Sequence, residues 1–175
     1  MMRARRAGAG RRSARWLRAL PGALALWFAV AATDALAATC SASTVGVAFG
    51  GYDVFNATPS TSTGSVKVTC TLGAEVFVRV NYTISLATGS SNSFVQRTMK
   101  SGANALGYNL YTSNAYSTVW GDGSGSTAMV AGSITIWIFN PSGSTTTTVY
   151  GRVPALQDVA VANNYQDNVT VTVTY

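Results

Sequence analysis

Apolar and polar residues alternate along most of the chain after residue 40, in short runs separated by Gly, Ser, Asn and Asp. Alternation with a period of two residues is typical of β-strands that bury one face. The apolar residues of each run share one parity: Val45, Val47 and Phe49; Val66, Val68 and Cys70; Val76, Val78, Val80 and Tyr82; and Ile134, Ile136 and Ile138. No run after Ala37 has the period of a helix. The pattern therefore predicts an all-β protein in which each of these faces is half buried.

Two of the predicted strands carry additional information. Trp137 and Phe139 make the second face of one run apolar, which predicts either a central strand or a contact surface. The last run alternates Val and Thr up to the final residue, with its apolar face at Val169, Val171, Val173 and Tyr175. An edge strand offers unpaired backbone groups to a partner chain, whereas a strand inside a closed sheet does not. The pattern alone leaves both possibilities open.

Recognisable turn residues separate the predicted strands. Asp122-Gly123 favours a hairpin, and Asn140-Pro141-Ser142-Gly143 favours a reverse turn. Several short strands joined in this way are typical of an immunoglobulin-like, Greek-key β-sandwich. We therefore expect one domain of this class.

The positive charge of the chain is concentrated at its beginning. The formal net charge is +6, yet seven of the twelve basic residues are arginines before residue 19, and from Ala38 onward five basic residues face five acidic ones. An apolar stretch from Leu17 to Ala32 and the sequence Ala35-Leu36-Ala37 follow the arginines. This order is typical of a secretory signal peptide. We expect export by the general secretion route, cleavage after Ala37, and a mature domain at residues 38–175.

A membrane anchor is the alternative interpretation of the same segment. Pro21 and Gly22 interrupt it, and it is shorter than the roughly 20 apolar residues that a membrane span needs. The signal peptide is therefore the favoured hypothesis, and no stable membrane insertion is expected after cleavage.

The chain has two cysteines, Cys40 and Cys70. An even number of cysteines in an exported chain predicts a disulfide, which would tie the start of the mature domain to a strand. The alternative is a pair of buried free thiols. A disulfide would leave no thiol for nucleophilic catalysis or for zinc.

Catalytic chemistry has little support in the composition. The chain contains no histidine, which removes Ser-His-Asp and Cys-His catalysis. Most acidic residues of the domain lie beside turn residues, so solvated acids are favoured over a glycosidase pair, and the turn at Asp122 has too few carboxylates for calcium. We expect no enzyme activity, cofactor or metal. Nucleic-acid binding lacks a basic surface once the signal peptide is removed.

Several motifs in order resemble one family, the spore coat protein U domain, which includes secreted pilin subunits of archaic chaperone-usher pili. The matching segments are Phe49-Gly50-Gly51-Tyr52-Asp53, Val66-Lys67-Val68-Thr69-Cys70-Thr71, Arg97-Thr98-Met99, Leu106-Gly107-Tyr108-Asn109-Leu110-Tyr111, Val119-Trp120-Gly121-Asp122-Gly123, Val149-Tyr150-Gly151-Arg152-Val153-Pro154-Ala155 and Tyr165-Gln166-Asp167. Together with the final Val-Thr run, they cover nearly the whole predicted domain.

The resemblance implies an incomplete immunoglobulin-like fold that lacks its last strand and so has an apolar acceptor groove. Val169, Val171, Val173 and Tyr175 would line this groove and contact a periplasmic chaperone, whose basic residues would hold the carboxylate of Tyr175. A strand donated by another pilin subunit would replace the chaperone during assembly through an outer-membrane usher. Such fibres serve surface adhesion and biofilm formation. A bridge between Cys40 and Cys70 also fits the family pattern.

The chain departs from the family at its predicted mature N-terminus. Family pilins usually carry a longer donor segment before the first cysteine, whereas only Ala38 and Thr39 precede Cys40 here. We therefore expect a subunit that accepts a strand but donates one poorly, at a tip or as a terminator. Two alternatives stay open: a self-contained spore coat or matrix protein whose own chain closes the groove, and a carbohydrate-binding module that uses Trp137 or Tyr116.

Overall fold

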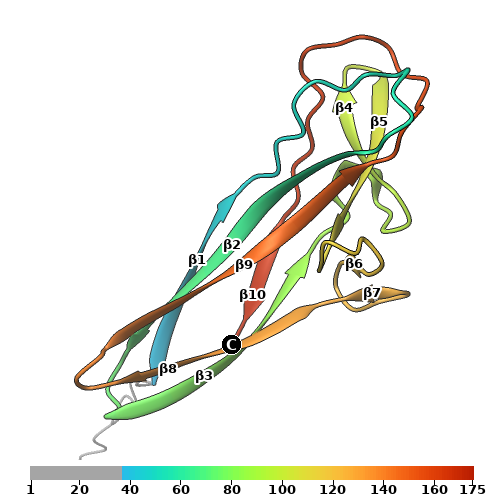
Figure 1. Cartoon of the computed structure of the whole chain (residues 1–175). Coiled ribbons are helices and arrows are strands. Elements are labelled where there is room, and N and C mark those ends of the chain that lie inside the picture. Colours follow the sequence, from blue (N-terminus) through green and yellow to red (C-terminus); the bar gives the residue numbers. More distant parts are fainter. Residues whose placement is uncertain (1–36) are drawn as a thin grey trace, which may run out of the picture. The chain divides into compact units, whose positions relative to one another are not determined.

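The computed structural model describes residues 37–175, which form two β-sheets and one short 3₁₀ helix (Figure 1). The elements in chain order are β1 (Ala38–Val45), β2 (Ser60–Leu72), β3 (Phe77–Leu86), η1 (Gly89–Ser91), β4 (Arg97–Ser101), β5 (Asn104–Tyr111), β6 (Val119–Trp120), β7 (Thr127–Ala128), β8 (Val130–Trp137), β9 (Ser142–Val153) and β10 (Val171–Thr174). The expected signal peptide, residues 1–37, lies outside the described residues apart from Ala37. Among the described residues, no helix has the length and apolar character needed to cross a membrane.

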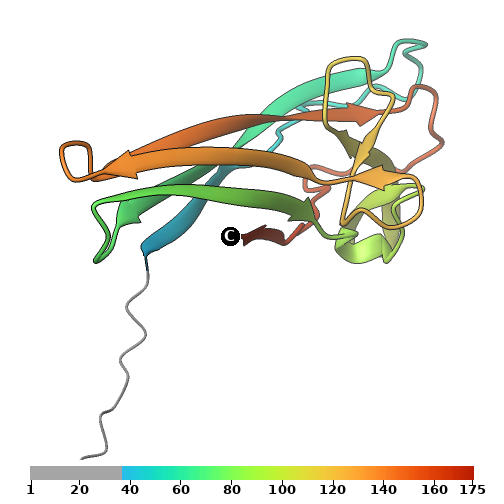
Figure 2. The ribbon, with the colours of Figure 1, turned by 90° about the horizontal axis from the view of Figure 1, so that it is seen from below.

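The larger sheet has the strand order β1-β2-β9-β5-β6-β7, with β4 also paired to β5, and the smaller sheet has the order β10-β3-β8. The chain passes from one sheet to the other five times, after β2, β3, β7, β8 and β9. Figure 2 shows one of these passages, at the β8–β9 turn, and the short β10 near the marked C-terminus. The predicted all-β, immunoglobulin-like Greek-key sandwich is confirmed.

The core is built from the alternating residues that the pattern predicts. Val66, Val68 and Cys70 of β2 are almost completely buried, and Ile84 and Ile136 bury the facing side of the smaller sheet. A residue that faces the core in a strand is followed by one that faces outward, so burial repeats every second residue. The core therefore lies between the two sheets.

Three predicted strand runs extend beyond the strands that the structure shows. β1 ends at Val45, so Val47 lies in the following loop. Val76 and Ile138 lie just outside β3 and β8 and are 66% and 57% exposed, so their predicted half burial was wrong. β8 pairs only with β3, and Trp137 is half exposed. The apolar second face of β8 thus belongs to an edge strand and not to a central one.

Both predicted turns are built differently from the expectation. The reverse turn lies at residues 137–140, where Trp137 and Asn140 exchange backbone hydrogen bonds of 3.1 and 2.9 Å. Ser142 already belongs to β9, because the long pairing of β9 with β2 draws it into the sheet. Asp122-Gly123 joins β6 to β7, which pair in parallel, so it does not form a simple antiparallel hairpin.

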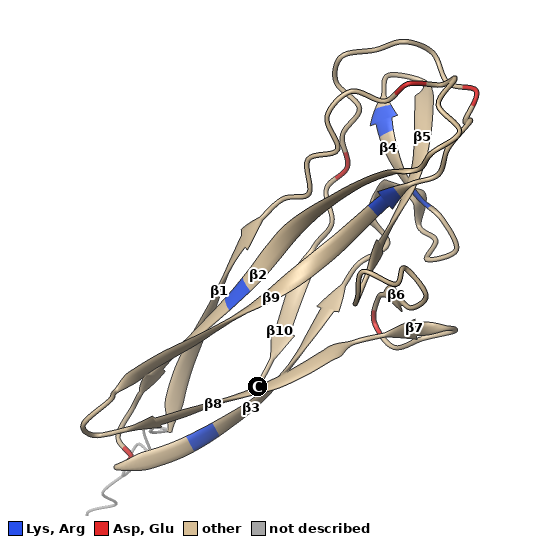
Figure 3. Ribbon diagram, viewed as in Figure 1, with Lys and Arg blue, Asp and Glu red and all other residues tan. Residues whose placement is uncertain are grey.

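The predicted disulfide is confirmed, with an S–S distance of 2.03 Å between Cys40 and Cys70. These cysteines face each other directly in the β1–β2 register, and the described residues contain no free cysteine. The bridge ties the start of β1 to the end of β2. Figure 3 shows that charged residues are few along the described ribbon and that residues of one sign do not gather in one region of it.

Candidate functional site: an apolar groove between two sheet edges

β1 has a hydrogen-bonded strand on one side only among the described residues, where it pairs with β2 over its whole length. Gly73 N–H donates to the carbonyl oxygen of Ala37 at 3.0 Å, so Ala38 and Leu72, which lie between them, form a pair that is not hydrogen-bonded. Backbone groups alternate in direction along an antiparallel strand. The N–H and C=O groups of Ala42 and Thr44 therefore point away from β2, toward the free edge.

β10 has the same property in the other sheet, because it pairs only with β3. Ala87 N–H donates to the carbonyl oxygen of Thr170 at 2.9 Å, which sets the alternation along this strand. The N–H and C=O groups of Val171 and Val173 therefore point away from β3. β10 is an edge strand, which settles the question that the sequence pattern left open.

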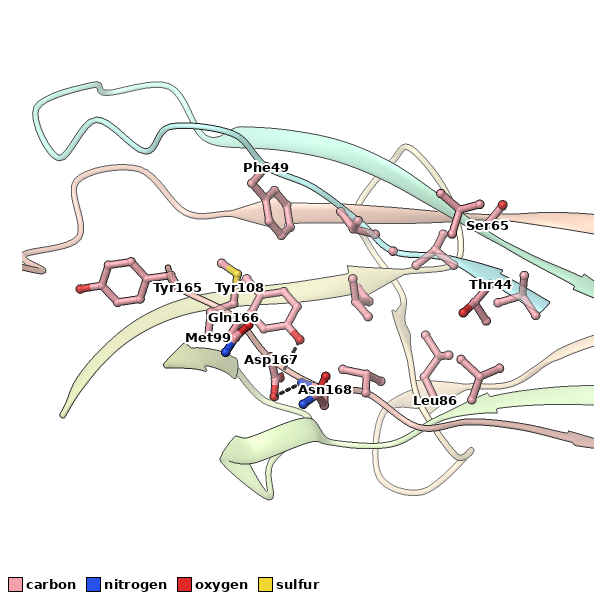
Figure 4. A pocket seen from close by; sticks show the side chains of 18 residues that line it. Thr44, Phe49, Ser65, Leu86, Met99, Tyr108, Tyr165, Gln166, Asp167 and Asn168 are labelled. Atoms are coloured by element: carbon pink, nitrogen blue, oxygen red, sulfur yellow. Dashed lines mark hydrogen bonds between the residues drawn. The ribbon is translucent and has the colours of Figure 1, made fainter. Parts of the chain in front are cut away.

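A cavity of about 350 Å³ lies between these two edges and forms the groove of Figure 4. Its lining includes Val66 and Val149 from the larger sheet and Leu86 from the smaller one, all members of the buried core. Thr44 of β1 and Val171 of β10 lie on its two sides. The groove therefore lies where one more strand would cover the core and pair with both edges.

The segment that follows β1 crosses part of the groove. A Cβ atom added at Gly151 would lie 2.6 Å from Cγ1 of Val47 and 2.7 Å from Cζ of Phe49, so these side chains use the space that the glycine leaves. The Phe49 ring also meets Tyr108 edge to face, with 5.9 Å between ring centroids. Val47 and Phe49 therefore point inward although they lie beyond the strand, as their parity predicts.

Val169, Val171, Val173 and Tyr175 were predicted to line the groove. Val169 and Val171 line the cavity, and Val173 is partly buried against the core. Tyr175 is 57% exposed, and its hydroxyl donates to the carbonyl oxygen of Cys40 at 3.4 Å. The final side chain thus spans from the end of β10 to Cys40 of β1, outside the lining of the cavity.

Asp167 fixes the segment that enters β10. Its carboxylate accepts hydrogen bonds from the Tyr108 hydroxyl at 2.7 Å and from the backbone N–H of Asn168 at 2.9 Å (Figure 4). The backbone N–H of Ser90 also donates to it, at 2.9 Å. Burial raises the pKa of Tyr108, and the hydrogen bond to Asp167 raises it further. These contacts hold one wall of the groove against β5 and η1.

Arg97 is fully buried beneath this wall. Its guanidinium donates to the carbonyl oxygens of Ala87 and Trp120 and to Oδ1 of Asn109, at distances of 2.7 to 3.0 Å. Burial lowers the pKa of Arg97, while the nearby Tyr108 and Asp167 oppose this shift. Arg97 lies within one of the family motifs, and no local pattern of apolar residues in the sequence predicts its burial or this network.

The residues considered for carbohydrate binding do not come together. Trp137 lies beside Phe139 in the β8–β9 turn, with 6.5 Å between ring centroids. Tyr116 instead packs edge to face on Tyr111 and lies under the guanidinium of Arg152. Within residues 37–175, no group of three His, Cys, Asp or Glu side chains is placed to hold a metal ion.

The fold and the groove define an incomplete β-sandwich, in which two unpaired edges flank an uncovered part of the core. The chain belongs to the Spore Coat Protein U domain family, since the sequence model of this family matches residues 26–172. The comparison with curated proteins finds no match.

Among solved structures, the chain is similar to one described as the CsuC-CsuE chaperone-tip adhesion subunit pre-assembly complex from archaic chaperone-usher Csu pili of Acinetobacter baumannii. The sequence identity is 23% and the TM-score is 0.45. The match covers 79% of this chain, which spans 40% of the length of the solved chain.

Proposed function

We propose that this protein is a structural, non-catalytic subunit of an extracellular pilus assembled by a chaperone and an usher. The observation that carries the proposal is the apolar groove between β1 and β10, which has unpaired backbone groups on both sides. A sheet edge of this kind binds an extended segment through main-chain hydrogen bonds, and the side chains that enter the groove give specificity. Membership of the Spore Coat Protein U domain family supports the same assignment.

The groove is occupied in turn by two partners in this proposal. A periplasmic chaperone covers it first, with basic residues on the carboxylate of Tyr175, and a strand of another pilin subunit replaces the chaperone at the outer-membrane usher. The free edge of β10 supports both binding steps, because Val171 and Val173 present their side chains and their unpaired backbone groups to an incoming strand. The protein is exported through the periplasm to the cell surface, where its fibre serves adhesion and biofilm formation.

The decisive experiment places one charge in the groove and a matched charge outside it. We would produce the full chain in a Gram-negative periplasm together with an archaic pilus chaperone, and measure the chaperone that copurifies. Val171→Asp puts a carboxylate into the groove, whereas Thr172→Asp puts the same group on the exposed face of β10. We expect Val171→Asp to lose the chaperone and Thr172→Asp to retain it, because burying an unpaired charge costs several kcal/mol.

A second measurement is needed because Val171 also packs against the core, so Val171→Asp can unfold the chain as well as block the groove. A synthetic strand that alternates Val and Thr is added to the unaltered chain, and a control strand carries Asp at the Val positions. The apolar strand should bind and protect the chain from protease, and the control strand should do neither. A purified chain that is folded, monomeric and indifferent to both strands would contradict the proposal and favour a self-contained coat protein.

A further inference from the structure

One short segment of the chain divides the groove into two hollows. The cavity between β1 and β10 has a volume of about 350 Å³, and a second hollow of about 560 Å³ lies between residues 47–54 and 159–165. Val47, Phe49, Met99 and Tyr165 line both of them, so the two hollows meet at these side chains. Figure 4 shows Phe49 across the cavity from Met99 and Tyr165. We call residues 46–51 the plug.

The larger sheet is hollowed beneath the plug. Gly64 of β2 and Gly151 of β9 are buried and bear no side chain on the inner face of the sheet. A Cβ atom added at Gly64 would lie 2.5 Å from the carbonyl oxygen of Val45, and one added at Gly151 would lie 2.6 Å from Cγ1 of Val47. A glycine inside a strand often marks a place where another backbone approaches closely. The two glycines therefore form a seat into which the plug fits.

Side chains hold the plug in this seat, and the backbone contributes little. Among the described residues, no backbone–backbone hydrogen bond involves residues 46–51, because the pairing of β1 with β2 ends at Val45. The Ser60 hydroxyl donates to the carbonyl oxygen of Phe49 at 3.5 Å, a long hydrogen bond. Val47 and Phe49 are only partly buried against the core. A segment with few buried contacts and unpaired backbone groups opens at a low free energy.

Glycines lie at both ends of the plug. Gly46 follows β1, and Gly50 and Gly51 follow Phe49. A Cβ atom added at any of these three glycines would meet nothing within 4 Å, so the backbone has open space around it. Gly50 has a φ of 72°, which glycine adopts without strain. Hinges are a few residues at the ends of an element that absorb changes in φ and ψ. The plug therefore has a hinge on each side of Val47 and Phe49.

We propose that the plug is displaced by the far part of a donated strand, so that the groove distinguishes long strands from short ones. A short strand fills the cavity beside β10 and leaves the plug in place. A longer strand displaces Val47 and Phe49 from Gly64 and Gly151 and joins the two hollows into one groove. Such a strand offers backbone groups as well as alternating side chains, whereas the plug offers side chains alone. The inference rests on the proposed function, because it describes the regulation of the same groove.

Strand length is the first test. Residues 165–171 line the cavity and residues 159–165 line the second hollow, so alternating Val-Thr strands of about 7 and about 13 residues match the open and the joined groove. The unaltered chain should bind the long strand about tenfold more tightly in calorimetry, because about three further valines are buried while two plug side chains are released. A control strand of the long length, with Ser at the added Val positions, should bind like the short one.

A disulfide that locks the plug is the second test. Val47→Cys with Gly151→Cys brings two thiols within reach of a bridge, since Cγ1 of Val47 lies 2.6 Å from a Cβ atom at position 151. The locked chain should bind the short strand within about twofold of the unaltered chain and lose the gain from the longer strand. Val47→Cys alone carries the same change in the plug without a bridge and should keep the gain.

Thiol labelling follows the plug directly and does not depend on the lock. The Phe49→Cys thiol should react slowly with a maleimide in the free chain and with the short strand bound, because this position is packed against the core. The long strand should raise its rate about tenfold by moving the plug into solvent. Val45→Cys is the matched control, since Val45 is 66% exposed, and its rate should be the same in all three states.

The outcomes separate this inference from the proposed function. Retention of the full gain in the locked chain, or an unchanged rate for Phe49→Cys with the long strand bound, would overturn displacement of the plug. In both cases binding of the short strand would leave the proposed function intact. Binding of neither strand to the unaltered chain would overturn the proposed function, and the inference with it.

Discussion

Replacing Arg97 by methionine tests how the wall of the groove is held. The arginine is fully buried and donates to Ala87, Trp120 and Asn109, so it joins the loop after β3, the end of β6 and the middle of β5. Methionine has a similar length and no donor. The substitution therefore removes the hydrogen bonds and leaves most of the side-chain volume in place.

The expected loss of stability follows from the hydrogen-bond acceptors that Arg97→Met leaves behind. The buried carbonyl oxygen of Trp120 would lose its charged donor, whereas Oδ1 of Asn109 would lose Arg97 but keep the N–H of Leu110 at 3.1 Å. A buried polar group without a partner costs about 1–3 kcal/mol. Removing the buried charge recovers some desolvation energy, which offsets part of this cost. We therefore expect Arg97→Met to lower the free energy of unfolding by about 2–5 kcal/mol.

The assay is urea unfolding of the purified chain, followed by tryptophan fluorescence. Trp120 is fully buried, and its indole N–H donates to the carbonyl oxygen of Ile84, so its emission reports on this region. Arg79→Met is the matched control, because Arg79 is exposed and makes one side-chain hydrogen bond, to Ser133. It should change stability by less than about 0.5 kcal/mol. Equal midpoints and slopes for the two variants would refute the role given to Arg97.

Three further predictions concern other parts of the fold. The raised pKa of Tyr108 favours its protonated form in the folded state. The protonated side chain therefore stabilises the fold below about pH 10, and this contribution is lost as the pH rises further. Tyr108→Phe should therefore flatten the alkaline fall of the unfolding midpoint, and an unchanged fall would count against this assignment. Cys40→Ala with Cys70→Ala should cost about 3–4 kcal/mol in urea unfolding, since the bridge spans a sequence separation of 30; a loss below 1 kcal/mol would be too small for this model. Gly151→Val should cost about 1–3 kcal/mol by crowding the segment after β1, whereas Gly46→Ala, in open space, should leave the melting temperature unchanged.

The core could be predicted from the sequence because the alternation of buried and exposed residues in a strand can be seen within a few neighbouring positions. Val66, Val68 and Cys70 alternate with polar residues, and the period of two alone assigns them to one face. The disulfide was likewise accessible, because an exported chain with two cysteines has one possible pairing. Both inferences depend on the residues themselves and not on their distant neighbours.

The turns and the buried arginine could not be predicted in the same way. Asn140-Pro141 has ordinary turn chemistry, yet the chain turns three residues earlier because Pro141 accepts a hydrogen bond from Leu72 of another strand. Arg97 is buried because carbonyl groups from three separate segments meet around it. These outcomes depend on long-range pairing, which a sequence window does not contain.

The last strand shows how the same local pattern acquires a different meaning from its surroundings. Val66 and Val68 lie in β2, which has a strand on each side, and they are at most 1% exposed. Val171 and Val173 alternate with threonine in the same way but are only partly buried, because β10 has a neighbour on one side. A strand supplied by another chain would cover these valines and pair with the outward backbone groups of β10. The incomplete burial of an otherwise regular strand is therefore the physical basis of the proposed assembly.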